Sequence, residues 1–438
     1  MEKKEPCSSA DSSTRCKTSP VVKTLGAALG ILLISSIGAL SGWAEESATL
    51  GQFHPYSRGG PHVPGLEPGV TLSQANAQLA REVLPDEVLR LLAAGNLEIT
   101  IQETTDLPPR PLYIDATLQY SQGVSLNGGR TLGNYRAGVP FPLLDPADPQ
   151  AGEKLAWNLR YRDLGETVEM WPTTREVTSS GGVEHSNHGH MRIRFGMYRP
   201  NPADNDSQWQ EQGIFMKHSF ELLAPSDQEG AMNIRVIYDD DGRPTEQWRY
   251  SPQNRRTHKD YTNYVAPIGG TYEMLQEEQP PFFFQGYLHN YRWAFLGARV
   301  MLVPGFSKTP ELRFGGKQGW YPQVPWELRH VLVLECTPHN SHPFGRRVLF
   351  LDQQTYTPLL ILTYDPAGAF VRLVITAHAH PNFHPGSNGV HLPMMAGVAF
   401  INYAKDRATL MIAGDSAAYN RPLAAQRFEL MEILRRGK

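Results

Sequence analysis

The stretch RRVLFLDQQTYTPLLILTYDPAGAFVRLVITAHAH, residues 346–380, decides the fold. Its short apolar runs are separated by turn residues, a pattern that predicts three consecutive β-strands. The turn DPAG joins the last two strands, since Pro366 suits the second position of a β-turn and Gly368 the left-handed position that follows. In the last strand, the neighbours Leu373 and Val374 point to opposite faces. Strands that are apolar on both faces need cover on both faces.

Strand signals continue through most of the chain after about residue 112. In NIRVIYDDDGRPTEQWRY, residues 233–250, apolar and polar side chains alternate, DDDG turns the chain, and Trp248 and Tyr250 share a face of the return strand. The strand–helix alternation typical of parallel sheets is not found in this sequence. We therefore predict a mainly β, α+β protein whose antiparallel sheet curls around an interior.

The first 44 residues have the form of a secretory signal peptide. A net-basic leader precedes the apolar run Thr24–Ala44, and the small residues Gly42 and Ala44 predict cleavage after Ala44. The alternative is a membrane anchor, because the run approaches the ~20 residues that span a bilayer. The small-x-small ending and the acidic residues that follow it favour cleavage.

The remaining chain is interpreted as two parts. Residues 45–111 form a Gly- and Pro-rich extension with one short helix around PDEVLRLLAAG, where Pro85 suits the first turn and Gly95 the end. Residues 112–438 form the β domain. We find no repeat and no low-complexity tract in either part.

Charge and cysteine content limit the classes of partner. Without a leader of five basic and three acidic residues, the chain keeps 36 basic and 41 acidic residues, a net charge near −5. This charge argues against nucleic acid or an anionic membrane surface as the main partner. Cys336 is then the only remaining cysteine, so an intrachain disulfide is excluded.

Two groups of histidines stand close together in the sequence: His185, His188 and His190, and His378, His380 and His384. Imidazoles at such spacings can converge on zinc or copper. The first group, however, lies in GVEHSNHGHMR, whose Gly, Ser and Asn are typical of an exposed turn, and no acidic or Cys partner stands at ligand spacing. We expect surface or hydrogen-bonded histidines, and no metal or other cofactor.

Aromatic residues are concentrated in PPFFFQGYLHNYRW, residues 280–293. Each ring by itself is accounted for by an ordinary core. Adjacent rings on a strand, however, point in opposite directions and cannot all face one core. We therefore expect some of these rings to line a cavity or its mouth.

Three segments together resemble a known family: NYRAGVPFPLLDPADPQAGEKLAWNLRYR (134–162), EQWRYSPQNRR (246–256) and RRVLFLDQQTYTPLLILTYDPAG (346–368). This is an uncharacterised family of exported Gram-negative proteins that is described as similar to outer-membrane lipoprotein-sorting proteins. The resemblance extends from about residue 112 to the C-terminus. It implies the fold of the periplasmic lipoprotein carrier and its outer-membrane receptor (the LolA and LolB type), an antiparallel sheet rolled into an incomplete β-barrel with a few helices plugging its mouth over an apolar cavity.

The resemblance also implies a place of action. Members of the family are often associated with export pumps of the resistance–nodulation–division type, which implies a periplasmic shuttle between a pump and the outer membrane with transient membrane contact. The chain departs from the carriers by its greater length and by the segment GVEHSNHGH, and from the receptor by lacking a lipid-anchor cysteine after the apolar run. The cargo therefore does not follow from the fold.

We interpret the chain as a non-catalytic periplasmic carrier for an apolar small molecule or lipid. The residues expected to line the cavity or its mouth are Trp248, Tyr250, Phe283, Tyr287, Leu362 and Leu373. Two alternatives belong to other classes. A ligand-free structural adaptor of an envelope complex predicts a solid interior, and a metal-dependent periplasmic hydrolase predicts bound metal at one of the histidine groups.

The signal peptide leads to the first testable prediction. Because the small-x-small ending lies just before Glu45, the periplasmic form should begin at that residue. Edman sequencing of protein released from the periplasm checks this. A full-length chain that is extracted only with detergent would instead support the membrane anchor.

Overall fold

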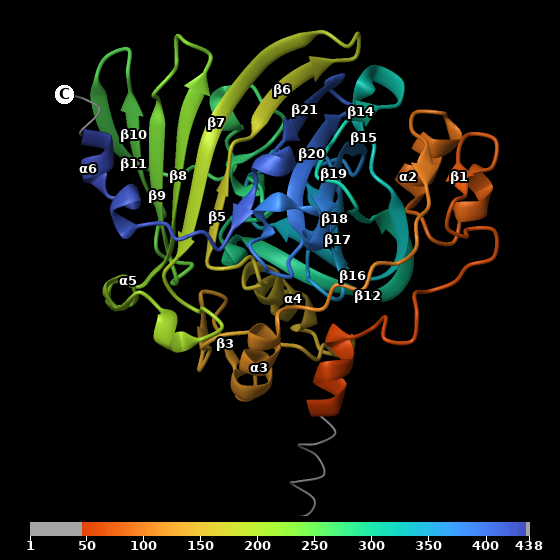
Figure 1. Cartoon of the computed structure of the whole chain (residues 1–438), viewed down its shortest axis with the longest axis horizontal. Helices are drawn as coiled ribbons and strands as arrows, with labels where there is room; N and C mark the ends of the chain where they lie inside the picture. The colour runs from red at the N-terminus through yellow and green to blue at the C-terminus, as the bar shows by residue number, and fades with distance from the viewer. Residues whose placement is uncertain (1–45, 435–438) are drawn as a thin grey trace, which may run out of the picture. The chain divides into compact units, whose positions relative to one another are not determined.

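The computed structural model describes residues 46–434 (Figure 1). The predicted signal peptide, residues 1–44, lies outside the described residues, so its cleavage stays a prediction. From Thr49 onward the chain forms one compact unit, in which the predicted extension and the predicted β domain pack together. Within residues 46–434, no helix is long and apolar enough to cross a membrane.

A 16-stranded sheet organises this unit (Figure 1). Its main path is a series of antiparallel pairs in the order β11 (Arg256–Tyr261), β10 (Glu246–Ser251), β9 (Met232–Tyr238), β8 (Ile214–Ala224), β7 (Val183–Phe195), β6 (Thr173–Thr178), β21 (Arg407–Ile412), β20 (Met394–Asn402), β19 (Phe370–Ala379), β18 (Pro358–Tyr364), β17 (Arg346–Asp352), β16 (Trp326–Pro338) and β12 (Tyr291–Pro304). Off this path, β13 (Phe306–Ser307) runs parallel to β19, and β5 (Thr167–Met170) pairs with β7 and β22 (Ala418–Tyr419).

The expected mainly β, antiparallel architecture is confirmed, with a correction to its shape. The path begins at β11 and ends at β12, and these strands do not pair with each other. The sheet is therefore open, and it is not strongly curled into the expected incomplete barrel. The three strands predicted from residues 346–380 are β17, β18 and β19, and Gly368 adopts a φ of 87° in the predicted turn.

The smaller elements surround this sheet. Besides the helical residues 46–53, the α-helices are α2 (Asp86–Ala93), α3 (Pro111–Tyr120), α4 (Ala151–Arg160), α5 (Ser207–Glu211) and α6 (Leu430–Leu434). The two-stranded sheets are β1 (Thr71–Leu72) with β2 (Ile99–Thr100), β3 (Ser125–Asn127) with β4 (Thr131–Gly133), and β14 (Phe314–Gly315) with β15 (Tyr321–Pro322). Helix α2 confirms the predicted helix: it follows Pro85, has two acidic residues in its first turn, and precedes Gly95 at a φ of 71°.

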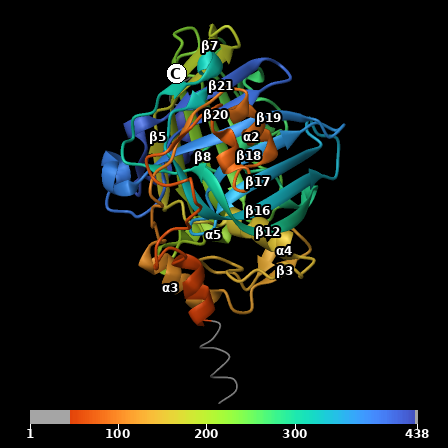
Figure 2. The same cartoon turned by 90° about the vertical axis from the view of Figure 1, so that its right-hand side faces the viewer.

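One face of β16–β21, here called the α2 face, is covered by the N-terminal extension (Figure 2). Val88 and Leu92 of α2 share a buried cluster with alternate residues of β16 to β21, among them Leu362 and Leu373. Polar contacts fix this cover at the sheet edge, since Thr105 N–H donates to Glu327 (2.9 Å). The extension therefore supplies the cover that the sequence of β18 and β19 requires.

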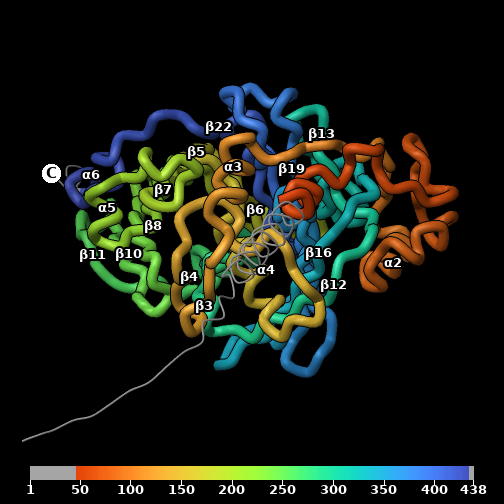
Figure 3. The backbone as a smooth tube through the Cα atoms, turned by 90° about the horizontal axis from the view of Figure 1, so that it is seen from below, coloured from red at the N-terminus to blue at the C-terminus, as the bar shows by residue number. Residues whose placement is uncertain are grey.

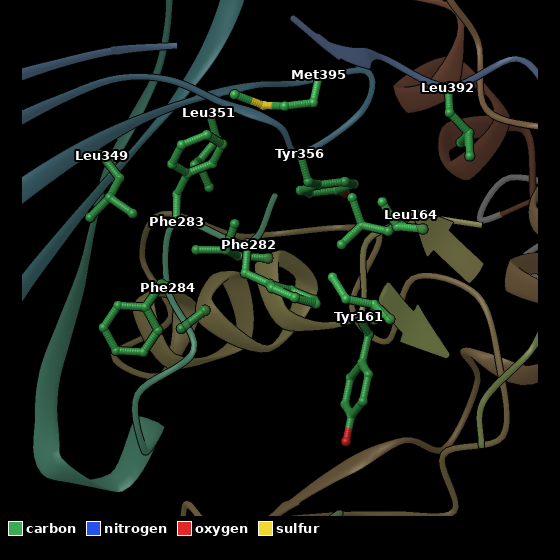
Figure 4. Close-up of a cluster of buried hydrophobic side chains, with 14 of the residues drawn as sticks. Tyr161, Leu164, Phe282, Phe283, Phe284, Leu349, Leu351, Tyr356, Leu392 and Met395 are labelled. Atoms are coloured by element: carbon green, nitrogen blue, oxygen red, sulfur yellow. The ribbon is translucent and has the colours of Figure 1, made fainter. Parts of the chain in front are cut away.

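The opposite face, here called the α4 face, is covered by helix α4 and by residues 282–284. Figure 3 shows α4 beside β12 and β16, and its Leu155 and Trp157 are fully buried there. Phe282, Phe283 and Phe284 lie in the same core as Leu349 and Leu351 of β17 (Figure 4).

The three adjacent phenylalanines correct the expectation that neighbouring rings cannot share a core. Phe282, Phe283 and Phe284 are all at most 4% exposed and belong to one buried cluster. The sequence argument assumed a strand, whereas these residues form a turn in which Phe283 has a φ of 60°. A left-handed residue redirects the chain, so the three rings can reach the same core.

Leu373 provides a test of the two-sided cover. It is 0% exposed on the α2 face, so Leu373→Glu would place a carboxylate in an apolar core. We expect the free energy of unfolding, measured with urea, to fall by about 4 kcal/mol or more, because burial opposes ionisation by several pKa units. The control is Leu296→Glu, at a leucine that is 45% exposed, with an expected change within about 0.5 kcal/mol. Equal effects of the two substitutions would contradict this packing.

Candidate functional site

A cavity of ≈ 430 Å³ lies on the α4 face over strands β6–β10. Residues 268–280, here called the covering segment, contribute to its wall opposite the strands. The apolar side chains that line it are Met191, Phe220, Leu222, Ile268, Met274 and Met411. The cavity therefore interrupts the apolar core of this face.

Strand register places the lining of the cavity floor. Met191, Phe220, Asn233 and Arg249 stand opposite one another on β7, β8, β9 and β10. Two residues further along β9, Arg235 stands opposite Gln247 of β10. Because cross-strand partners in an antiparallel sheet share a face, all of these side chains point toward the cavity.

Buried ion pairs attach the covering segment to the sheet. Glu277 pairs with Arg347 of β17 (2.7 Å) and accepts a hydrogen bond from the Tyr291 hydroxyl (2.6 Å). Glu278 pairs with Arg372 of β19, whose Nη1 donates to Glu278 Oε2 at 2.9 Å. Burial alone would raise the pKa of Glu277, but Arg347 and the hydrogen bonds outweigh it, so this pKa is lowered.

Arg235 is the charged group at the buried end of the cavity. Its side chain is only 2% exposed, and its Nη1 donates to Gln279 Oε1 at 2.9 Å while Nη2 donates to Gln276 Oε1. Burial lowers the pKa of Arg235, and the charge of Arg249 acts in the same direction. Its cross-strand neighbour His218 is neutral at pH 7, because burial and the charge of Arg235 lower its pKa well below the usual range.

The six side chains predicted to bind a ligand lie in four places, and none belongs to the residues that line this cavity. Trp248 and Tyr250 lie on the other face of β10, in a cluster with Ile234 and Ile433. Leu362 and Leu373 stand opposite each other on the α2 face.

The remaining two predicted residues, Phe283 and Tyr287, follow the covering segment in the chain. Phe283 is in the core beneath α4 (Figure 4). The Tyr287 hydroxyl accepts a hydrogen bond from Thr245 N–H (2.7 Å), and its ring contacts that of Tyr264 edge-on. No ligand contact is tested for any of the six, so their binding role stays a prediction.

The first histidine group lies on a strand and not in the expected exposed turn. Residues 183–195 form β7, where His188 is hydrogen-bonded to Thr173 and His190 to Glu169 (2.7 Å). His185 lines the cavity. Within residues 46–434, no three His, Cys, Asp or Glu side chains converge as a metal ion would require.

The other candidates for chemistry are held by ordinary packing. Burial lowers the pKa of His378 to about 3, and it raises the pKa of the Cys336 thiol to about 11. His380 and His384 accept hydrogen bonds from the backbone N–H groups of Asn382 and Gly386. Burial and these hydrogen bonds fix the side chains within the fold.

Arg235, Gln276 and Gln279 were not predicted from the sequence. Asn233 and Arg235 occupy the polar positions of an alternating strand, a pattern that does not distinguish a solvent face from the wall of a cavity. The apolar residues between Ile268 and Phe284 could have indicated a cavity wall, because they need a face of the sheet to pack against.

Comparison with known proteins gives a family match. A family model described as "Protein of unknown function (DUF1329)" matches residues 71–429. In a direct comparison, no curated protein matches the chain. The match of the family model over most of the chain confirms the family resemblance seen in the sequence.

Three solved structures are similar to this chain. A DUF1329 family protein from Desulfovibrio piger is 12% identical, with 66% of this chain and 99% of that chain covered and a TM-score of 0.46. A putative outer membrane lipoprotein-sorting protein domain from Vibrio parahaemolyticus is 16% identical, with 66% and 100% covered and a TM-score of 0.46. A LolA superfamily protein from Nitrosomonas europaea is 10% identical, with 63% and 94% covered and a TM-score of 0.37.

The Glu277 ion pair predicts a pH dependence. Because its pKa is lowered from 4.5 in the folded protein, its contribution to stability is complete above that value and is lost as the pH falls through the lower folded pKa. Glu277→Gln should reduce the free energy of unfolding at pH 7 by about 3–5 kcal/mol, since it leaves Arg347 buried with less compensation. It should also flatten the decline in stability below that pH.

Urea denaturation between pH 3 and pH 7 measures both effects. The matched control is Glu311→Gln, at a glutamate whose side chain is 77% exposed. A Glu277→Gln protein with the same acid profile and midpoint as the control would show that the pair does not hold the covering segment.

Proposed function

Because the chain belongs to the DUF1329 family of proteins of unknown function, we propose its role from its own geometry. It is a non-catalytic carrier that binds a lipid-like or other apolar ligand in the cavity beneath the covering segment. The observation that carries this proposal is a partly apolar cavity between the strands and the covering segment, in the face that carries the apolar core of α4.

The size and lining of the cavity support a small apolar ligand. Its volume of ≈ 430 Å³ falls within the roughly 300–1,000 Å³ of typical small-molecule sites. Met191, Met274 and Met411 supply three flexible thioether side chains, which adapt to ligands of irregular shape. Each methylene removed from water contributes about 0.8 kcal/mol, so an acyl chain can be held without a covalent bond.

The covering segment would close the cavity, which is the role that the resemblance assigned to helices at the mouth of a barrel. It crosses the α4 face and is anchored at Glu277 and Glu278 and also at Glu273, which pairs with Lys405 (3.0 Å) and accepts a hydrogen bond from Asn402 Nδ2 (2.6 Å). A segment fixed at several points keeps the cavity beneath it open to a ligand without collapsing onto the strands.

The place of action is part of the same proposal. The predicted signal peptide supports a periplasmic location. The sequence resemblance to lipoprotein-sorting proteins supports shuttling between an inner-membrane pump of the resistance–nodulation–division type and the outer membrane, with transient membrane contact. A ligand-free structural adaptor and a metal-dependent hydrolase remain as outcomes of the test below.

A leucine pair in the chain allows a matched binding test. Leu222 lines the cavity from β8 and is only partly buried, so Leu222→Glu should leave folding intact while placing a charge beside the ligand. We expect the affinity for a fluorescent acyl-chain probe to fall at least tenfold, with the melting temperature within a few degrees of the parent. Leu296→Glu, at an exposed leucine outside the cavity, should bind as the parent does.

Native mass spectrometry of protein from its own periplasm identifies a co-purifying ligand. Delipidated, folded protein that takes up no acyl-chain or sterol probe at micromolar concentration would favour the adaptor. Stoichiometric zinc or copper that is lost when His185, His188 and His190 are replaced would favour the hydrolase.

A further inference from the structure

The cavity has a polar end as well as an apolar one, and the charge at this end is positive. The residues that line the cavity include Arg235 and Arg249 but neither Asp nor Glu. Arg249 is partly compensated, because it pairs with Asp260 on the neighbouring strand β11. Arg235 is the deeper of the two, at 2% exposure.

Three other buried arginines are bound by groups of the protein itself. Arg329 pairs with Glu327 and Asp352, and Arg372 pairs with Glu278. Arg162 forms no ion pair within the described residues, but its guanidinium donates to the carbonyl oxygens of Leu159, Pro281 and Phe282.

Arg235 resembles Arg162 in having no carboxylate partner among the described residues, but of these arginines only Arg235 lines the cavity. Within residues 46–434 no carboxylate lies within ion-pair distance of it, and its Nε is buried without a hydrogen-bond partner. Its bound partners are two neutral amides. A buried cation that lacks a counter-ion lowers stability by several kcal/mol, which a bound anion would offset.

Three glutamines make this end of the cavity rich in N–H donors. Because a guanidinium can only donate, Gln276 and Gln279 must turn their carbonyl oxygens toward Arg235. Gln247, opposite Arg235 in the sheet, accepts from the Thr262 hydroxyl through its Oε1 (3.1 Å). All three amides thus use their acceptor on the protein, and their NH₂ groups lie near the cavity that they line, where that of Gln279 donates weakly to Met191 Sδ (3.9 Å).

We propose that the buried end of the cavity is an anion subsite, in which Arg235 and the amides of Gln247, Gln276 and Gln279 bind the carboxylate or phosphate head of a single-chain amphiphile. The apolar tail lies against Met191, Phe220 and Met274. This proposal rests on the carrier function proposed above and adds the chemical class of the ligand. Arginine suits the role because its planar fork matches both kinds of oxyanion.

Ligand pairs that differ only at the head test the subsite on the unmodified protein. The probes are dodecanoate, monododecyl phosphate and dodecanol, measured by competition against a fluorescent acyl probe on delipidated protein at pH 7.5. We expect at least one of the two anions to bind ten or more times more tightly than dodecanol. The better of the two anions distinguishes a fatty-acid ligand from a phosphate-headed one.

Substitutions then assign the preference to its residue. Arg235→Met should abolish the preference for the anion while changing dodecanol affinity less than threefold, and Arg235→Lys should retain part of it. Arg249→Gln at the rim is the matched control and should keep the preference. Arg235→Lys and the comparison of ligands keep the test valid if Arg235→Met does not fold.

The outcomes separate the two proposals. Dodecanol that binds as tightly as both anions, or an anion preference that survives in Arg235→Met, overturns the anion subsite and leaves the carrier function standing. Failure of all three probes to bind the folded parent overturns the carrier function itself.

Discussion

The ion pairs of Glu277 and Glu278 with Arg347 and Arg372 are the constraint on which the arrangement of this protein depends. These charges lie in the middle of an apolar sheet face, where each is tolerable only next to its partner. They place the chain between Ile268 and Phe284 across the strands, so one half of this face receives three phenylalanine rings and the other half keeps a cavity. The division of the α4 face into core and cavity thus follows from a few fixed charges.

The two faces of the sheet are covered in different ways. On the α2 face, the N-terminal extension packs leucine and valine side chains directly against the strands, and no side chain from it is needed for the cavity. On the α4 face, cover comes from inside the domain, from α4 and from the covering segment. Behind the cavity floor, the other side of β9 and β10 packs against Ile433 of α6.

The sequence predicted the sheet better than the cavity. Runs such as Leu359–Tyr364 are apolar at successive positions, so both their strand character and their need for two-sided cover can be read directly. Alternating strands are less informative, since Arg235 occupies a polar position that looks the same whether it faces water or a cavity. The same ambiguity explains why Trp248 and Tyr250 were expected to line the cavity. They lie on the other face of β10, and their neighbours Gln247 and Arg249 line the cavity. Aromatic residues were a poor guide to the cavity, because large rings fill cores as readily as they line binding sites.

The docking of the extension on the α2 face has a consequence for the order of folding. Gln102 bonds to Glu327, which is 225 residues later, and Leu107 N–H donates to Gln354, which is 247 residues later. For a chain that is translocated from its N-terminus, the first segment to emerge has no surface to fold on until the strands of the last third have followed. Contacts of such long range make folding slow and keep apolar segments exposed for longer. The extension of a chain that is exported by the predicted signal peptide can therefore complete its packing only after those strands have followed it.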